Sequence, residues 1–135
     1  MLHTVAASQM NVFIVEDSAS IRERLAAMLG EIDGVTVVGE AKSPQEALEG
    51  IGRIRPDSVV LDIHLVGGTG IEVLRQGHLQ SPGTVFIVLT NYPNAQYRRV
   101  CTEAGAAYFF DKSSEIAKVR EVIEGLGAGR SESSN

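Results

Sequence analysis

Residues 58–63 read SVVLDI, a short apolar run that contains a single aspartate, Asp62. Each of four further apolar runs is short and rich in Val, Ile, Leu or Phe: Met10–Val15, Val35–Val38, Thr84–Leu89 and Ala107–Phe110. Short continuous runs of this composition are typical of strands that are buried on both faces of a parallel sheet. The sequence therefore predicts five such strands.

The segments between these runs have the residue spacing of amphipathic helices. In the first segment Ile21, Leu25 and Leu29 recur every four residues and share one helix face. The second segment opens with Ser43-Pro44-Gln45-Glu46: an N-cap, a proline suited to the first helical position, and a glutamate placed to complete a capping box. The predicted helices begin near Ser18 or Ser20, at Ser43, after Gly70, near Asn94 and near Ser114.

Strands and helices alternate along the chain, which predicts right-handed crossovers and helices on both faces of the sheet. The expected fold class is α/β, a doubly wound five-stranded parallel sheet. We expect residues 10–126 to form one domain and residues 1–9 to form an N-terminal extension. Residues 127–135, GAGRSESSN, are expected to be a disordered tail. No second domain, and hence no output domain, is expected.

Charge and composition exclude several classes of protein. A formal net charge of −5, with 12 scattered Lys and Arg residues, argues against sequence-independent binding to nucleic acid. The N-terminus lacks the features of a signal peptide, and no apolar run is long enough to predict a membrane span. The single cysteine, Cys101, suits a reducing compartment and is interpreted as a core residue of the fourth helix. A cytoplasmic protein without membrane contact is predicted.

Polar residues stand at the carboxyl ends of the predicted strands, where open parallel sheets bind their ligands. They are Glu16-Asp17, Asp62, Thr90 and Asp111-Lys112. Crowded carboxylates repel one another unless a cation lies among them, and Mg²⁺ prefers oxygen ligands. The sequence therefore predicts a magnesium site at this edge of the sheet.

The same residue types suit phosphoryl transfer. A metal ion and a lysine neutralise the phosphoryl oxygens, and a threonine hydroxyl donates a hydrogen bond to them. An aspartate is a known nucleophile for this reaction and forms an acyl phosphate. These residues together are a more specific signal than any one of them alone.

Four motifs closely resemble those of receiver domains of two-component response regulators: FIVEDS (13–18), VVLDIHL (59–65), VLTNY (88–92) and FFDKS (109–113). The resemblance implies the (βα)5 flavodoxin-like receiver fold, with strand order 2-1-3-4-5. It also implies a stand-alone signalling module, not an enzyme, that is phosphorylated by a histidine kinase or a phosphorelay partner. Ser113 and Val66 depart from the family, in which proline is frequent at both positions.

The resemblance assigns a role to each acidic residue. Asp62 would be the phosphoacceptor and a metal ligand. Asp17 would bind Mg²⁺ directly and Glu16 would act through water, while His64 would contribute its backbone carbonyl.

Further roles follow for residues around the phosphoacceptor. Thr90 and Lys112 would hold the phosphoryl oxygens, and Phe109 would occupy the aromatic switch position. The side chains of His64 and Tyr92 would modulate the lifetime of the acyl phosphate. The fourth helix, fifth strand and fifth helix would then form the surface that controls a downstream protein.

Other interpretations remain open. The chain would be a phosphohydrolase if Asp62 carried an enzymatic intermediate, although His64 stands where such enzymes usually have a second acid. It would be an interaction module if it were never phosphorylated, or a fragment of a DNA-binding regulator if an output domain followed. The segment Gly67–Gly70 lacks the lysine of a P-loop and is interpreted as a flexible turn.

Overall fold

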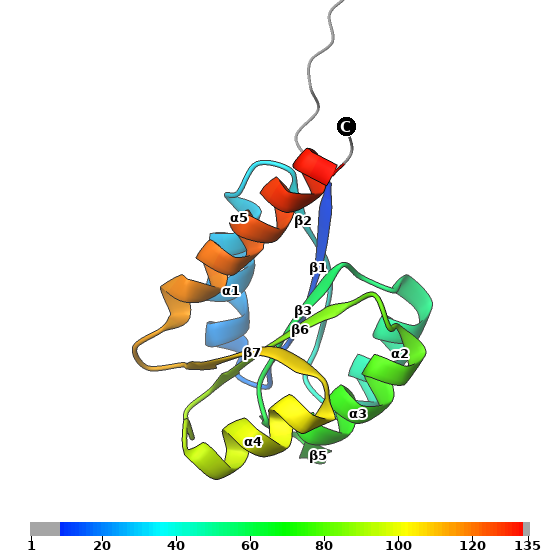
Figure 1. Ribbon diagram of the computed structural model, residues 1–135. Helices are drawn as coiled ribbons and strands as arrows, with labels where there is room; N and C mark the ends of the chain where they lie inside the picture. Colours follow the sequence, from blue (N-terminus) through cyan, green and yellow to red (C-terminus); the bar gives the residue numbers. More distant parts are fainter. Residues whose placement is uncertain (1–8, 134–135) are drawn as a thin grey trace, which may run out of the picture.

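The computed structural model describes residues 9–133 and contains one large parallel sheet (Figure 1). Its strands lie in the order β2-β1-β3-β6-β7. In chain order they are β1 (Met10–Val15), β2 (Val35–Ala41), β3 (Ser58–Leu61), β6 (Val85–Thr90) and β7 (Ala106–Asp111). The predicted strand order is confirmed, because these five strands, numbered along the chain, follow the order 2-1-3-4-5.

Five helices cover the two faces of the sheet, so the fold is doubly wound (Figure 1). They are α1 (Ala19–Gly30), α2 (Pro44–Ile54), α3 (Gly70–Gln80), α4 (Ala95–Ala104) and α5 (Ile116–Ser133). Apolar residues of α1 and α5 form one core with the sheet, and those of α2, α3 and α4 form the other. Successive residues of β1 alternate between the two cores, as the period of a strand requires.

The core beneath α2 is packed tightly around one aromatic ring. A Cβ atom at Gly50 would lie 2.5 Å from Cζ of Phe13, and one at Gly39 would lie 2.6 Å from Cε2 of the same ring. Both glycines therefore make room for Phe13, which is 3% exposed. This ring fixes β1 against α2 and β2, three residues before the first acidic residue of the site.

Helix caps match the predictions at most positions. Ser18 caps α1, and Ser43 caps α2 with Pro44 directly after it. The predicted capping box of α2 is wrong: the Glu46 carboxylate accepts from the backbone N–H of Lys42 instead of that of Ser43. A reciprocal box is found at the start of α3, where Thr69 and Glu72 bond to each other's backbone N–H groups.

Two segments differ from the predicted loops. The predicted flexible turn, Gly67–Gly70, supplies the second strand of a short antiparallel hairpin, β4 (His64–Leu65) with β5 (Gly68–Thr69). Gly67 takes a positive φ of 82° between the two strands and closes the turn. The predicted disordered tail is wrong for residues 127–133, since α5 continues to Ser133. Its glycines disfavour a helix locally, yet the helix continues through them, and Gly127 and Ala128 line the same hollow as Met10, the first residue of β1.

Residues 1–8 of the predicted N-terminal extension, and residues 134–135 of the tail, lie outside the described residues. Within 9–133, every helix is too short or too polar to cross a membrane.

Candidate phosphoryl and metal site

The carboxyl edge of the sheet is aligned by backbone hydrogen bonds that continue beyond the strands. The N–H of Glu16 donates to Ala41 O at 2.9 Å, and the N–H of Asp62 donates to Val15 O at 3.0 Å. On the far side the N–H of Lys112 donates to Thr90 O at 2.8 Å. These bonds hold the residue that follows each strand in register with its neighbour, so side chains distant in sequence meet above the sheet.

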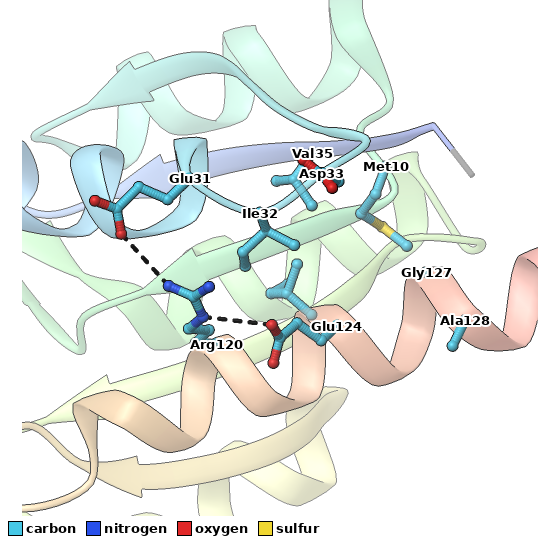
Figure 2. Close-up of a pocket in the computed structure, with 10 residues that line it drawn as sticks. Met10, Glu31, Ile32, Asp33, Val35, Arg120, Glu124, Gly127 and Ala128 are labelled. Carbon is cyan, nitrogen blue, oxygen red and sulfur yellow. Dashed lines mark hydrogen bonds and ion pairs between the residues drawn. The ribbon is translucent and has the colours of Figure 1, made fainter. Parts of the chain in front are cut away.

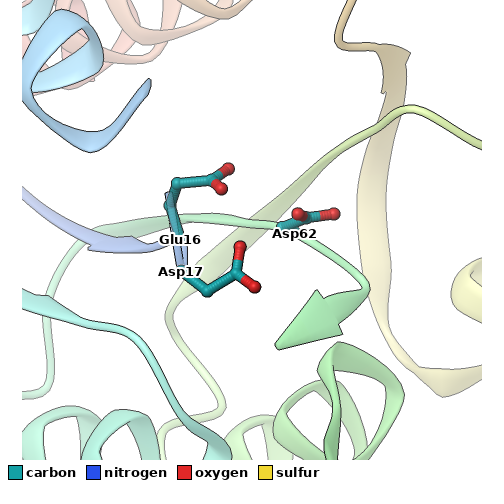
Figure 3. A group of neighbouring side chains, drawn as sticks. All are labelled: Glu16, Asp17 and Asp62. Carbon is teal, nitrogen blue, oxygen red and sulfur yellow. The ribbon is translucent and has the colours of Figure 1, made fainter. Parts of the chain in front are cut away.

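Three carboxylates meet there (Figure 3). One oxygen from each of Glu16, Asp17 and Asp62 lies within 4.8 Å of the others. Glu16 and Asp62 are buried, whereas Asp17 is exposed and opens the cluster to solvent. A group of hard oxygen donors with one open side fits Mg²⁺, which keeps several waters beside one or two carboxylates.

Lys112 is the cation of the cluster. Its Nζ lies 2.8 Å from Oε1 of Glu16 and 2.8 Å from Oδ2 of Asp62, and its side chain is only 8% exposed. Burial by itself lowers the pKa of Lys112, but the hydrogen bonds to Asp62 and Glu16 outweigh it, so the pKa is raised. The ammonium is therefore charged over the whole physiological range.

Glu16 is held on both oxygens. Oε1 accepts from Lys112, and Oε2 accepts from the backbone N–H of Ser18 at 3.1 Å. Burial raises the pKa of Glu16 in spite of these two bonds. Arg22 adds a third restraint, because Nη1 donates to the backbone carbonyl of Glu16 at 2.7 Å. With both oxygens bonded to the protein, Glu16 is less available than Asp17 to bind an ion directly.

The loop after Asp62 is closed tightly. The second oxygen of Asp62, Oδ1, accepts from the N–H of His64 at 3.4 Å, a long bond that leaves it nearly free. Gly70 donates its N–H to Ile63 O at 2.6 Å. A Cβ atom at Gly70 would lie 2.2 Å from the carbonyl oxygen of Asp62, so only glycine fits at this position.

Most of the predicted site residues line one cavity of about 490 Å³: Glu16, Asp17, Asp62, His64, Tyr92 and Lys112. Thr90 and Phe109 do not line it. Thr90 is fully buried, and its Oγ1 accepts from the N–H of Tyr92 at 3.1 Å. The structure thus brings together the predicted metal and phosphoacceptor residues and leaves both predicted switch residues behind the cavity wall.

Phe109 lies in the core on the α4 side, 5% exposed. The guanidinium of Arg98 covers its ring at 4.8 Å from the centroid, and Nη1 donates to its carbonyl oxygen at 3.4 Å. A cation over an aromatic face is an attractive contact. Arg98 therefore links the outer surface of α4 to the predicted switch residue.

Aromatic rings form one wall of the cavity. His64 and Tyr92 meet edge to face with ring centroids 4.4 Å apart, and Tyr97 of α4 lies 6.0 Å from His64 and 6.5 Å from Tyr92. Both His64 and Tyr92 are exposed on their outer sides. These rings connect the loop after Asp62 to the first turn of α4.

Five lining residues had no predicted site role: Ser18, Ile21, Arg24, Asn91 and Ser113. Ile21 was assigned only to the apolar face of α1. Arg24 follows it by three residues, which places both on neighbouring positions of the helix surface. This spacing is the one signal that could have linked Arg24 to the site, since α1 begins beside Asp17.

The fold and the site together define a doubly wound α/β domain with a carboxylate cluster and a buried lysine at the carboxyl edge of its sheet. The chain belongs to the response regulator receiver domain family, whose match covers residues 12–124. Receiver domains are signalling domains of two-component systems, which bind Mg²⁺ at this acidic site and interact with histidine kinases and phosphotransfer proteins.

Several known proteins are similar to the chain. The DNA-binding transcriptional activator DevR/DosR of Mycobacterium tuberculosis is 34% identical over 122 residues, which cover 90% of this chain and 56% of that protein. A crystal structure of a LuxR-family two-component response regulator from Aurantimonas sp. has a TM-score of 0.83 and 30% identity, covering 91% of this chain and 88% of that one. The chain spans about half the length of the first curated relatives it matches.

A CheY-like receiver domain protein from Methanospirillum hungatei supports the fold. It has a TM-score of 0.80 and 24% identity, and the alignment covers 93% of this chain and 99% of that one.

Proposed function

We propose that this receiver accepts a phosphoryl group on Asp62 from a histidine kinase or a phosphotransfer protein. The observation that carries the proposal is the position of Asp62 in a partly open cavity, with Oδ2 2.8 Å from Lys112 and a carboxylate oxygen of Asp17 within 4.8 Å. The less restrained oxygen of Asp62 attacks phosphorus, the bond from phosphorus to the donor nitrogen breaks, and the donor imidazole leaves. Lys112 then transfers its hydrogen bond from the carboxylate to a phosphoryl oxygen.

Mg²⁺ would be held by the carboxylates of Asp17 and Asp62 and by the backbone carbonyl of His64. Glu16 would act through water, which agrees with the hydrogen bonds that already occupy both of its oxygens. When bound, the ion supplies positive charge that neutralises the phosphoryl oxygens. The residues of this chain orient Asp62 and keep the ammonium of Lys112 beside it.

Thr90 and Phe109 would carry the change of state. Phosphorylation adds strong acceptor oxygens, and Thr90 would exchange its bond with the N–H of Tyr92 for one with the phosphoryl group. That exchange moves the loop between β6 and α4. Phe109 and its contact with Arg98 would follow, changing the surface formed by α4, β7 and α5 and the binding of a protein partner.

His64 and Tyr92 would set the lifetime of the acyl phosphate. Their rings stand 4.4 Å apart at the cavity, where they limit the approach of a hydrolytic water. We also infer that the protein acts in the cytoplasm, where histidine kinases present their phosphorylated domains.

A second candidate function has one observation in its favour, the 56% share of DevR/DosR that the chain covers. If the sequence is part of a longer regulator, the surface of α4, β7 and α5 would control a DNA-binding segment of that protein after Asp62 is phosphorylated. Chemistry at Asp62 is the same in both cases. They differ in whether the surface of α4, β7 and α5 contacts a separate protein or a segment of the same chain.

The test is incubation with Mg²⁺ and acetyl phosphate, followed by mass spectrometry of the intact protein. Wild type should gain one phosphoryl group and Asp62→Asn should gain none. Asp33→Asn is the matched control, since Asp33 is an aspartate that lines a different hollow. Excess chelator should suppress the adduct. Equal yields on wild type and Asp62→Asn would refute the assignment.

A further inference from the structure

We propose that Arg24 on α1 binds the phosphoryl group of the incoming donor and positions it for transfer to Asp62. Arg24 lines the same cavity as Asp62 and Lys112, on the side where α1 begins beside Asp17. It would be a positioning residue for the phosphodonor, a role outside the metal, phosphoacceptor and switch positions. The inference rests on the proposed function.

The charges in the cavity create the need for a second cation. Its lining contains three carboxylates, Glu16, Asp17 and Asp62, but only two permanently charged cations, Lys112 and Arg24. Lys112 is already bonded to two of the carboxylates. A bound Mg²⁺ would offset the remaining negative charge but leave little to attract an anionic donor. An additional cation at the rim of the cavity lowers the electrostatic cost of bringing the anionic donor close to the carboxylates.

Arg24 is free to take this role. It is exposed, and among the residues that the structure describes its side chain has no hydrogen bond, ion pair or ring contact. Arg22, two residues earlier, is bonded at 3.2 Å to Glu40 and also to the carbonyl of Glu16. Arg24 is therefore the cation at this cavity whose donors are all still available.

A second hollow contains an arginine whose side chain is already paired with carboxylates of the protein (Figure 2). At that site, between the end of α1 and α5, Arg120 points toward two carboxylates and lies 3.4 Å from each of Glu31 and Glu124. Its guanidinium is neutralised by its own neighbours and has little capacity for a further anion. Arg24 differs from Arg120 in having no carboxylate partner among the described residues, so its guanidinium can still bind an anion.

The chemistry of guanidinium defines the ligand. Its planar fork of N–H donors matches two oxygens of a phosphoryl group, and it stays charged at every physiological pH. The group recognised is a terminal phosphoryl dianion, presented by a small acyl phosphate or by a protein phosphohistidine. Because Arg24 is exposed and Lys112 is buried, a donor would meet Arg24 first and then pass to the inner cation.

The test compares rates of phosphorylation by acetyl phosphate at saturating Mg²⁺, measured by quenching and mass spectrometry. Arg24→Gln should react roughly tenfold more slowly than wild type, the effect of removing one steering charge from a cleft. Arg24→Lys, which keeps the charge without the fork, should have an intermediate rate. Added salt should slow wild type more than Arg24→Gln. Arg75→Gln removes an exposed arginine from α3, away from the cavity, and should react like wild type.

A rate for Arg24→Gln within about twofold of wild type would overturn the inference, because a steering charge should change the rate by about tenfold or more. An equal loss in Arg75→Gln would overturn it too. Circular dichroism and thermal unfolding would verify that each variant is folded. Failure of the proposed function itself is distinguishable, because wild type would then gain no phosphoryl group or Asp62→Asn would gain it equally.

Discussion

Replacing Lys112 by methionine tests the electrostatics of the site most directly. The substitution keeps most of the length of the side chain and removes the ammonium that contacts Glu16 and Asp62 at 2.8 Å each. Both carboxylates are buried, at 1% and 7% exposure, so neither is well solvated when its partner is lost. Two negative charges would then face each other without a cation between them.

The size of the effect follows from burial. Removing one partner of a buried ion pair costs about 3–5 kcal/mol, because an uncompensated charge remains. Burial already raises the pKa of Glu16, so this carboxyl can take up a proton and limit the loss. We therefore expect Lys112→Met to lower the free energy of unfolding by about 2–4 kcal/mol near neutral pH without divalent ions.

Urea unfolding, followed by circular dichroism, measures this loss. Mg²⁺ should restore more stability to Lys112→Met than to wild type, because the ion replaces the missing positive charge. Adding Asp62→Asn to the variant should also recover stability, since it removes one of the two unpaired charges. Lys118→Met is the control, because the ion pair of Lys118 with Glu115 is on the surface and should matter far less.

The reasoning would be refuted if Lys112→Met lost less than about 1 kcal/mol, the range of an exposed ion pair. A loss that neither Mg²⁺ nor Asp62→Asn reduced would point to packing of the lysine stem instead of its charge.

Two further predictions concern the core. Gly50→Ala should destabilise the protein by about 1–3 kcal/mol through overpacking against Phe13. In a chain that also carries Phe13→Leu, the alanine should be neutral or favourable. Urea unfolding of the wild type, both single mutants and the double mutant measures this coupling, and additive effects would contradict the prediction. Burial raises the pKa of Cys101 to about 11 from an ordinary value of 9.0, so the native thiol should react with iodoacetamide at mildly alkaline pH roughly a hundredfold more slowly than the unfolded one. Because the folded-state pKa is raised, this group favours folding below pH 9.0, and its contribution of roughly 2–3 kcal/mol is lost as the pH rises toward 11. Cys101→Ala should lack that slope, and an equal slope in both proteins would exclude the thiol as its source.

The sheet and the composition of the site were predictable because both depend on residue type and order along the chain. Apolar runs define buried strands wherever they occur, and parallel strands bring their carboxyl ends to one edge. The meeting of Asp62 with Asp17 and Lys112 follows from these two facts alone. Its geometry agrees with the prediction, while the chemical roles stay proposals.

Details that depend on side-chain direction were not predictable. Glu46 has the correct spacing for a capping box, yet its carboxylate reaches Lys42, because several N–H groups lie within range of one flexible side chain. Arg24 and Arg98 are both exposed helical arginines in the sequence pattern, and only the fold places one at the cavity and the other over Phe109. The extension of α5 beyond Leu126 runs against local propensity, because the glycines of this segment disfavour a helix.

The contact between residue 70 and the carbonyl oxygen of Asp62 limits how this protein can be re-engineered. A library that randomises the hairpin from His64 to Thr69 can vary its tip, but residue 70 directly after it must stay glycine. Any larger side chain there would push the loop after Asp62 out of place. Loops exchanged between related proteins should therefore be cut after Gly70, so that the donor segment brings its own glycine with it.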